Sequence, residues 1–243
     1  MTGTKSDIKA QLQKEIFSLQ GCKRTSNEAL VNVKLGGMEQ SFPGGIFPLG
    51  GVHEFLCNTP EIKAASSGFI AGIASSLMQK EGVVIWIGPS RKLFPPALKA
   101  FGIQPHNVIF INVKREQDLL WVMEETLKCA GLAAVVAEMK TLSFTTSRRL
   151  QLAVESSGVS GFILRSSTEN GATACLTRWQ VKPLASDGGD ALPGLGFPRW
   201  SVDLLKVRNG TPGSWKMEWA AGSFRKVHEA PIALPHRIHK KIV

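Results

Sequence analysis

The strongest constraint on the fold is a series of short apolar runs that alternate with segments of helical periodicity. An uninterrupted apolar run is typical of a strand that is covered on both faces of a sheet. The runs lie at 83–87, 108–113, 132–137 and 161–164, and the helical segments at 94–101, 116–129 and 147–157. Because parallel strands need helical crossovers, this rhythm predicts an α/β fold with a doubly wound, mainly parallel sheet.

Two flanking regions complete the predicted core. Before the alternating part, a short strand at 52–56 is followed by a buried, small-residue-rich helix at 64–79. After it come strands at 174–181, 200–207 and 215–219, a long loop at 182–198, and the turn Arg208-Asn209-Gly210. An Asn-Gly turn between apolar runs indicates a hairpin, so the sheet should end in a C-terminal antiparallel extension.

The chain divides into three parts on this basis. Residues 23–220 form the core, residues 1–22 form an amphipathic helical arm, and residues 221–243 form a basic tail that we expect to be flexible. In the arm, Ile8, Leu12 and Ile16 fall on one stripe at helical spacing. Such a stripe packs either on its own core or on a partner, and the sequence leaves both open.

The charge of the chain indicates an acidic partner. Lysine and arginine total 29 against 19 acidic residues, which gives a net charge of +10. Such an excess favours a nucleic acid or an acidic protein surface, although a basic surface without a specific target is the alternative. The candidates for nucleic-acid contact are the tail residues Arg225, Lys226, Arg237, Lys240 and Lys241.

Composition also excludes several classes. No apolar run is long enough to span a bilayer, and the N-terminal residues lack the apolar core of a signal peptide, so we expect no membrane partner. The 4 cysteines do not have the spacing of metal ligands. We expect them to be reduced thiols in a cytoplasmic protein. We identify no metal site and no cofactor.

A sheet of this kind places a phosphate-binding loop between its first strand and helix. A P-loop needs Gly-x-x-x-x-Gly-Lys-Ser/Thr, and residues 57–66 read CNTPEIKAAS. We assign Ala64, Ala65 and Ser66 to the Gly-Lys-Ser/Thr positions, with Lys63 displaced in the helix register. Pro60 and Glu61 interrupt the loop, and Glu61 adds negative charge where phosphates would lie.

The other parts of an ATPase site are also incomplete. Glu138 follows the apolar run 132–137, where a carboxylate would hold magnesium, but an ion-pair or capping role is favoured without a phosphate cradle. The segment Gly88-Pro89-Ser90-Arg91 offers no acid to orient water. We therefore expect no enzymatic activity and no catalytic residue.

The order of these landmarks resembles the RecA core, and more specifically the ImuA family of RecA-like, SulA-like accessory proteins. Residues 44–55, GGIFPLGGVHEF, are similar to the segment that enters the RecA P-loop, and the GFILR strand at 161–165 also fits. The ImuA resemblance is carried by PLGGVHE (48–54), LWVMEE (120–125), SRRLQL (147–152), TRW (177–179) and PGSW (212–215). Together these phrases span most of the chain between its two ends.

The resemblance implies an SOS-induced, non-catalytic protein of translesion DNA synthesis. The implied partners are RecA, an ImuB-like protein and an error-prone DNA polymerase, with direct DNA contact left open. Lys206 and Arg208 precede Pro212 at the spacing of two RecA lysines that reach a neighbouring protomer's nucleotide, and the arm matches the RecA helix that docks on that neighbour. The segments that match the DNA-binding loops of RecA, after Glu138 and at 166–172, are short.

Two other functions remain as alternatives. One is a DNA-dependent ATPase of the RecA type, which Glu138 would support. The other is a SulA-like inhibitor of cell division, which would bind a cytoskeletal GTPase. The basic tail and the Lys206/Arg208 pair suit a nucleoprotein partner better than a GTPase.

Overall fold

A computed structural model describes residues 33–78, 82–90, 93–167, 171–186 and 196–227. The arm residues Ile8, Leu12 and Ile16, and the tail residues Arg237, Lys240 and Lys241, lie outside these ranges. None of the helices in the described part is long and apolar enough to cross a membrane.

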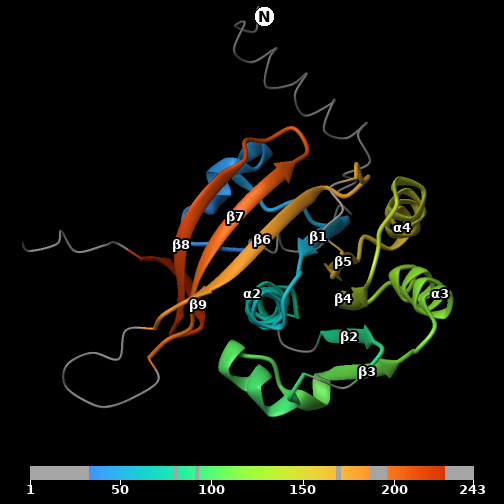
Figure 1. Cartoon of the computed structure of the whole chain (residues 1–243), viewed down its shortest axis with the longest axis horizontal. Helices are drawn as coiled ribbons and strands as arrows, with labels where there is room; N and C mark the ends of the chain where they lie inside the picture. The colour runs from blue at the N-terminus through green and yellow to red at the C-terminus, as the bar shows by residue number, and fades with distance from the viewer. Residues whose placement is uncertain (1–32, 79–81, 91–92, 168–170, 187–195, 228–243) are drawn as a thin grey trace, which may run out of the picture.

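A single mixed sheet organises the chain (Figure 1). Its strands are β1 (Val52–Leu56), β2 (Val83–Gly88), β3 (Val108–Asn112), β4 (Leu132–Met139), β5 (Ser160–Arg165), β6 (Thr177–Leu184), β7 (Arg199–Val207), β8 (Gly213–Ala220) and β9 (Ser223–Lys226). The order is β3-β2-β4-β5-β1-β6-β7-β8-β9. All pairs from β3 to β6 are parallel, and the pairs from β6 to β9 are antiparallel. The predicted fold class is therefore confirmed.

Helices lie on both faces of the parallel part. Helix α2 (Pro60–Met78) covers one face, and α3 (Glu116–Leu127) and α4 (Phe144–Ser157) cover the other (Figure 1). Four short 3₁₀ helices occupy connections: η1 (Met38–Ser41), η2 (Pro43–Gly45), η3 (Pro95–Phe101) and η4 (Pro105–Asn107). The segment 94–101 was expected to be helical, and Pro95–Phe101 forms the 3₁₀ helix η3, with two prolines in the first turn, where their missing N–H groups remove no intrahelical hydrogen bond.

Helix α2 packs closely because it is built from small residues. A Cβ added to Gly72 would lie 2.6 Å from Phe224 and 2.9 Å from Trp219, so a larger residue would push the helix away from the sheet. This close approach lets one helix cover strands of both the parallel and the antiparallel part.

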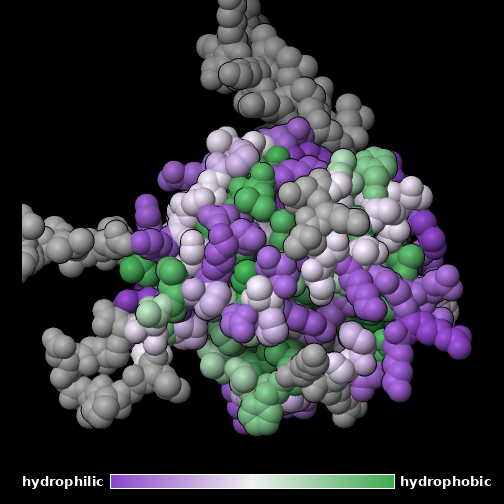
Figure 2. Space-filling model, viewed as in Figure 1, coloured by the Kyte–Doolittle hydropathy of each residue, from purple (hydrophilic) through white to green (hydrophobic). Residues whose placement is uncertain are grey.

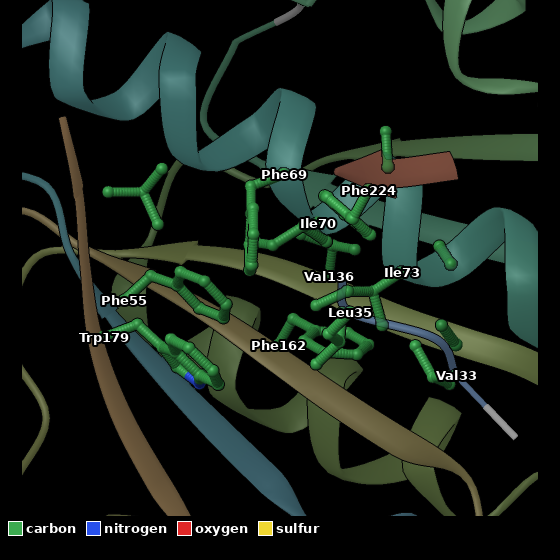
Figure 3. Packing of buried hydrophobic residues seen from close by; sticks show 14 of the residues in the cluster. Val33, Leu35, Phe55, Phe69, Ile70, Ile73, Val136, Phe162, Trp179 and Phe224 are labelled. Carbon is green, nitrogen blue, oxygen red and sulfur yellow. The ribbon is translucent and has the colours of Figure 1, made fainter. Parts of the chain in front are cut away.

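The core on the α2 side is aromatic. Phe55 of β1 stacks on Trp179 of β6 with ring centroids 6.0 Å apart, and Phe69 of α2 lies 5.8 Å from the same indole. Figure 3 shows these rings with Phe162 of β5 between the sheet and α2. Burial of such rings contributes most to stability per residue. The core on the other face is aliphatic, and includes Met123, Leu127, Leu150, Val154 and Ile163.

The antiparallel extension continues beyond residue 220, where the predicted core ended. The turn between β7 and β8 contains Asn209 in the left-handed region with φ 58°, as the Asn-Gly signal predicts. Strand β9, however, lies within residues 221–243, which were expected to be flexible tail. Its Phe224 is buried against Trp219 and Phe69, and this packing supplies the energy that orders the segment.

The α2-side core contains a buried histidine. His53 of β1 is fully buried, with its ring stacked between Phe47 and Phe162. The Nδ1 atom of His53 lies 2.8 Å from the Thr177 hydroxyl oxygen, which also accepts a hydrogen bond from the Trp179 indole. Burial lowers the pKa of His53 to about 3, so the imidazole is neutral in the folded protein.

This burial predicts acid sensitivity that depends on His53. The histidine pKa is about 3 in the folded state and near 6.5 in the unfolded state, so the unfolded state takes up a proton first as the pH falls. Stability is therefore complete above pH 6.5 and is lost below it, by about 2–3 kcal/mol at pH 4.5. We expect urea denaturation to show this loss between pH 7.5 and 4.5. His53→Gln should remove that component, whatever its stability at pH 7.5, and an equal pH-dependent loss in both proteins would contradict the prediction.

Candidate functional site

An ion pair occupies the place where a P-loop protein would hold nucleotide phosphates and magnesium. Lys63, in the first turn of α2, pairs through Nζ with Oε2 of Glu138 near the end of β4. The indole Nε1 of Trp86 in β2 donates to Oε1 of the same carboxylate over 3.3 Å. The side chains of Glu138 and Lys63 are 7% and 25% exposed, so the pair is largely shielded from water. Both carboxylate oxygens are therefore engaged by the chain itself.

This geometry corrects the register assigned from the sequence. Lys63, expected to be displaced, is the residue that reaches the end of β4, whereas Ala65 and Ser66 are buried within α2. With Cys57 as the first loop position, the pattern Gly-x-x-x-x-Gly-Lys-Ser/Thr places Ile62, Lys63 and Ala64 at its last three positions. The lysine of the motif is therefore present, while both glycines and the hydroxyl are replaced.

The start of α2 has little left to offer a phosphate. Pro60 has no N–H, and the N–H of Ile62 donates to the Thr59 hydroxyl over 3.3 Å. The backbone N–H of Lys63 is used by the Thr59 carbonyl. The hydrogen bond with Thr59 lowers the pKa of Glu61, which keeps this carboxylate charged at the helix N-terminus. Side chains of the chain thus take the role that a bound anion has in a P-loop.

The neighbouring positions add no catalytic group. Gly88, at the end of β2, faces the Glu138 carboxyl, and an added Cβ would lie 3.1 Å from its carbon. Burial raises the pKa of the Cys57 thiol to about 11, so this thiol is protonated and unreactive. Among the described residues, no group of three or more histidine, cysteine or carboxylate side chains could hold a metal ion.

A second ion network lies on the opposite face of the sheet, and the sequence analysis did not identify it. Glu54 of β1 is fully buried between Arg165 of β5 and Arg178 of β6. The distances are 2.9 Å from Oε1 to Arg165 Nε and 2.7 Å from Oε2 to Arg178 Nε. Thr173 also donates to Oε2, over 3.0 Å. The available signal was a charged residue in each of three strands: Glu54 in VHEFL, Arg165 at the end of SGFILR and Arg178 in TRWQVKPL.

The partner candidates Lys206 and Arg208 lie beside this network. Lys206 Nζ donates to the carbonyl of Thr173 over 2.6 Å, and an Arg208 guanidinium nitrogen donates to the carbonyl of Ala174 over 3.0 Å. Burial, and secondarily the nearby Arg178 and Arg208, lowers the pKa of Lys206. Lys206 is half-buried and holds a loop of its own chain, whereas Arg208 remains exposed.

Two of the tail candidates fall in the described part. Arg225 and Lys226 belong to β9, the edge strand of the antiparallel extension, and both side chains are exposed. Because successive residues of a strand point to opposite faces, their side chains lie on different sides of the sheet.

Comparison with curated proteins identifies the family. No family model matches the chain. Protein ImuA of Caulobacter vibrioides strain NA1000 / CB15N is 34% identical over 190 residues, which cover 73% of this chain and 78% of the relative. The same protein from strain ATCC 19089 / CIP 103742 / CB 15 gives the same values. The chain belongs to the ImuA family.

The phrases that carried the ImuA resemblance contain two of the three residues of the buried ion network. PLGGVHE ends at Glu54, and TRW contains Arg178. The third member, Arg165, ends the GFILR strand that was noted as RecA-like. The sequence signal used for the ImuA assignment therefore includes residues that join β1 to its two neighbours in the sheet.

Breaking this network should destabilise the protein strongly. Glu54→Gln leaves two guanidinium groups beside a neutral amide in the interior, and we expect a loss of about 3–5 kcal/mol in the free energy of unfolding. Glu155→Gln removes an exposed carboxylate of α4, and should change stability by less than about 0.5 kcal/mol. Urea denaturation monitored by circular dichroism measures both. Similar stabilities for the two variants would show that Glu54 does not hold the strands together.

Proposed function

We propose that this member of the ImuA family is a non-catalytic RecA-fold accessory protein of SOS-induced translesion DNA synthesis. In this role it binds RecA, an ImuB-like protein or an error-prone polymerase, and brings them together at damaged DNA. The proposal rests on family membership, and on the Lys63–Glu138 pair for its non-catalytic character.

The argument against catalysis is electrostatic. Phosphoryl transfer needs a lysine and a magnesium ion that are free to bind the phosphate oxygens. Here the lysine ammonium neutralises the carboxylate that would hold magnesium. A nucleotide would have to separate these two groups, and part of its binding free energy would be spent on breaking a largely buried ion pair before phosphate and magnesium could replace it.

A protein-binding role has support at the surface. Phe94, after β2, is 67% exposed, and Ile109 in the edge strand β3 is 51% exposed. Figure 2 shows hydrophobic residues gathered along the lower side of the molecule, in the region that η3 occupies in Figure 1. Exposed apolar groups of this size are typical of surfaces that contact other proteins.

An ATPase of the RecA type is the alternative that one observation favours, since the motif lysine and Glu138 both remain. We predict that the purified protein binds ATP more weakly than 1 mM (an expected threshold of about −4 kcal/mol) and shows no turnover. Calorimetry with ATP and magnesium, and phosphate release with and without DNA, measure the two properties. Micromolar affinity with magnesium-dependent turnover that Glu138→Ala abolishes would establish the alternative.

The partner hypothesis concerns the arm and the end of β7. We infer that the stripe Ile8, Leu12 and Ile16 and the pair Lys206/Arg208 lie on the two sides of a RecA-type contact with a RecA filament. Apolar side chains of the stripe would supply affinity, and the basic pair would supply orientation. Both side chains donate to carbonyls of the segment that follows β5, and Arg208 is the better basic residue to test because it is exposed whereas Lys206 is half-buried.

We expect Leu12→Asp/Ile16→Asp and Arg208→Glu each to weaken binding to RecA filaments by about tenfold or more. Lys114→Glu, which reverses an exposed charge after β3, serves as the control for Arg208→Glu and should bind as the wild type does. Co-sedimentation with RecA filaments and co-purification with an ImuB-like protein measure binding. Folded variants that bind both partners as tightly as the wild type would remove these surfaces from the proposal.

A further inference from the structure

The antiparallel extension has one face that no helix of the described part covers. Side chains of β6–β9 that face α2 are buried, whereas those on the opposite face are mostly exposed or half-buried. Helices α3 and α4 lie over β4 and β5, and do not reach β6–β9 (Figure 1). We call the uncovered side of β6–β9 the open face.

The strand register gives the residues of the open face. Leu184 pairs with Arg199, Arg199 with Glu218, and Glu218 with Arg225, which forms one row across four strands. The parallel rows are Lys182–Ser201–Lys216, Gln180–Asp203–Ser214 and Arg178–Lys206. Arg208 extends the face beyond β7, on the same side as Lys206.

Positive charge dominates this face. Among the residues that the structure describes, the acidic side chains of this face are Asp203 and Glu218, and each contacts a cation of the face: Lys182 at 3.8 Å and Arg199 at 2.6 Å. The cations of the face are Lys182, Arg199, Lys206, Arg208, Lys216 and Arg225, whereas Arg178 is largely buried and paired with Glu54. Figure 2 shows hydrophilic residues over β6 and β7 in this view. The excess of cations makes the face complementary to a polyanion.

We propose that the open face of β6–β9 binds the phosphate backbone of double-stranded DNA, without sequence preference. This inference goes beyond the proposed function, which requires only protein partners, and does not depend on it.

The composition of the open face favours double-stranded DNA over a protein or a single-stranded nucleic acid. A protein interface has an apolar or aromatic centre. The exposed apolar side chains in or beside β6–β9 are Leu184 and Phe197 at one end of the strands and Leu205 near the other, and the rows between them are polar or charged. Single-stranded nucleic acid is held by stacking of bases on aromatic rings. The tryptophans of β6–β8, which are Trp179, Trp200, Trp215 and Trp219, all pack on the α2 side. Cations on a polar surface suit the backbone of a duplex.

The size of the face also fits a duplex. Strand β7 has 9 residues, which corresponds to about 30 Å of extended chain. One turn of duplex DNA is about 34 Å long. Cations spread over that length reach phosphates of both strands across a groove, and their release of counterions makes the affinity salt-dependent.

The test compares double variants of the full-length protein that remove the same charge from different places. Lys216→Ala/Arg225→Ala alters the open face, and Lys114→Ala/Arg148→Ala alters exposed positions near α3 and α4. A third variant, Lys240→Ala/Lys241→Ala, alters the predicted basic tail. Fluorescence anisotropy with a labelled duplex and with a single strand of the same length gives the affinity at several salt concentrations.

We expect the open-face variant to bind the duplex about tenfold more weakly at 0.15 M salt, with the slope of log K against log salt reduced by about 2. The α3–α4 variant should stay within twofold of the wild type, and the wild type should prefer the duplex to the single strand. The proposal is overturned if the open-face variant binds as the wild type does, or if the α3–α4 variant loses as much. A loss confined to the tail variant, or tighter binding to the single strand, would overturn it equally.

Discussion

The buried carboxylate of Glu54 joins the two halves of the sheet. It lies in β1, the strand that separates the parallel part from the antiparallel extension, and it contacts an arginine from each neighbouring strand. A lone carboxylate in this position would cost several kcal/mol in desolvation, and two guanidinium groups compensate it only if β5, β1 and β6 keep their register. Arg178 continues the connection to Gly171 and Thr173, and Lys206 and Arg208 hold the same loop from β7. Three basic side chains, one from β6, one from β7 and one just after β7, therefore bind the segment between β5 and β6.

The pair Lys63–Glu138 lies on the other face of the sheet and has a different role. Glu54 connects strands, whereas Lys63 and Glu138 connect the start of α2 to the end of β4, where a ligand lies in related α/β sheets. Thr59 contributes to the same arrangement. Its hydroxyl accepts from the N–H of Ile62 and its carbonyl from the N–H of Lys63, which are amides that a phosphate would bind in a P-loop. Lys63 and Glu138 thus satisfy each other, which is more stable than a site with unpaired charges.

The sequence predicted the architecture better than the site. Apolar runs such as 132–137 identify buried strands because backbone geometry and burial on two faces leave few alternatives. The hairpin at Asn209 follows from an equally local signal, whereas the order of the strands within the sheet was not predicted. The register of Lys63 could not be settled in this way, because the loop lacks the glycines from which its positions are counted, and only the contact with Glu138 decides it.

Strand β9 was missed because the contact of Phe224 with α2, which is distant in the sequence, orders it. Arg165 and Arg178 are visible as charges in strands, but their common partner is more than 100 residues away.

The central position of β1 has a consequence for synthesis on the ribosome. Its two neighbours, β5 and β6, come from residues 160–165 and 177–184, so Glu54 and Arg178 are separated by 124 positions. At about 5–20 residues per second, β1 waits on the order of ten seconds for its second neighbour. During that time the nascent chain carries an apolar strand with an uncompensated carboxylate, and that charge opposes premature pairing with other apolar segments. The residue that fixes the sheet in the native protein therefore also protects its central strand before the sheet exists.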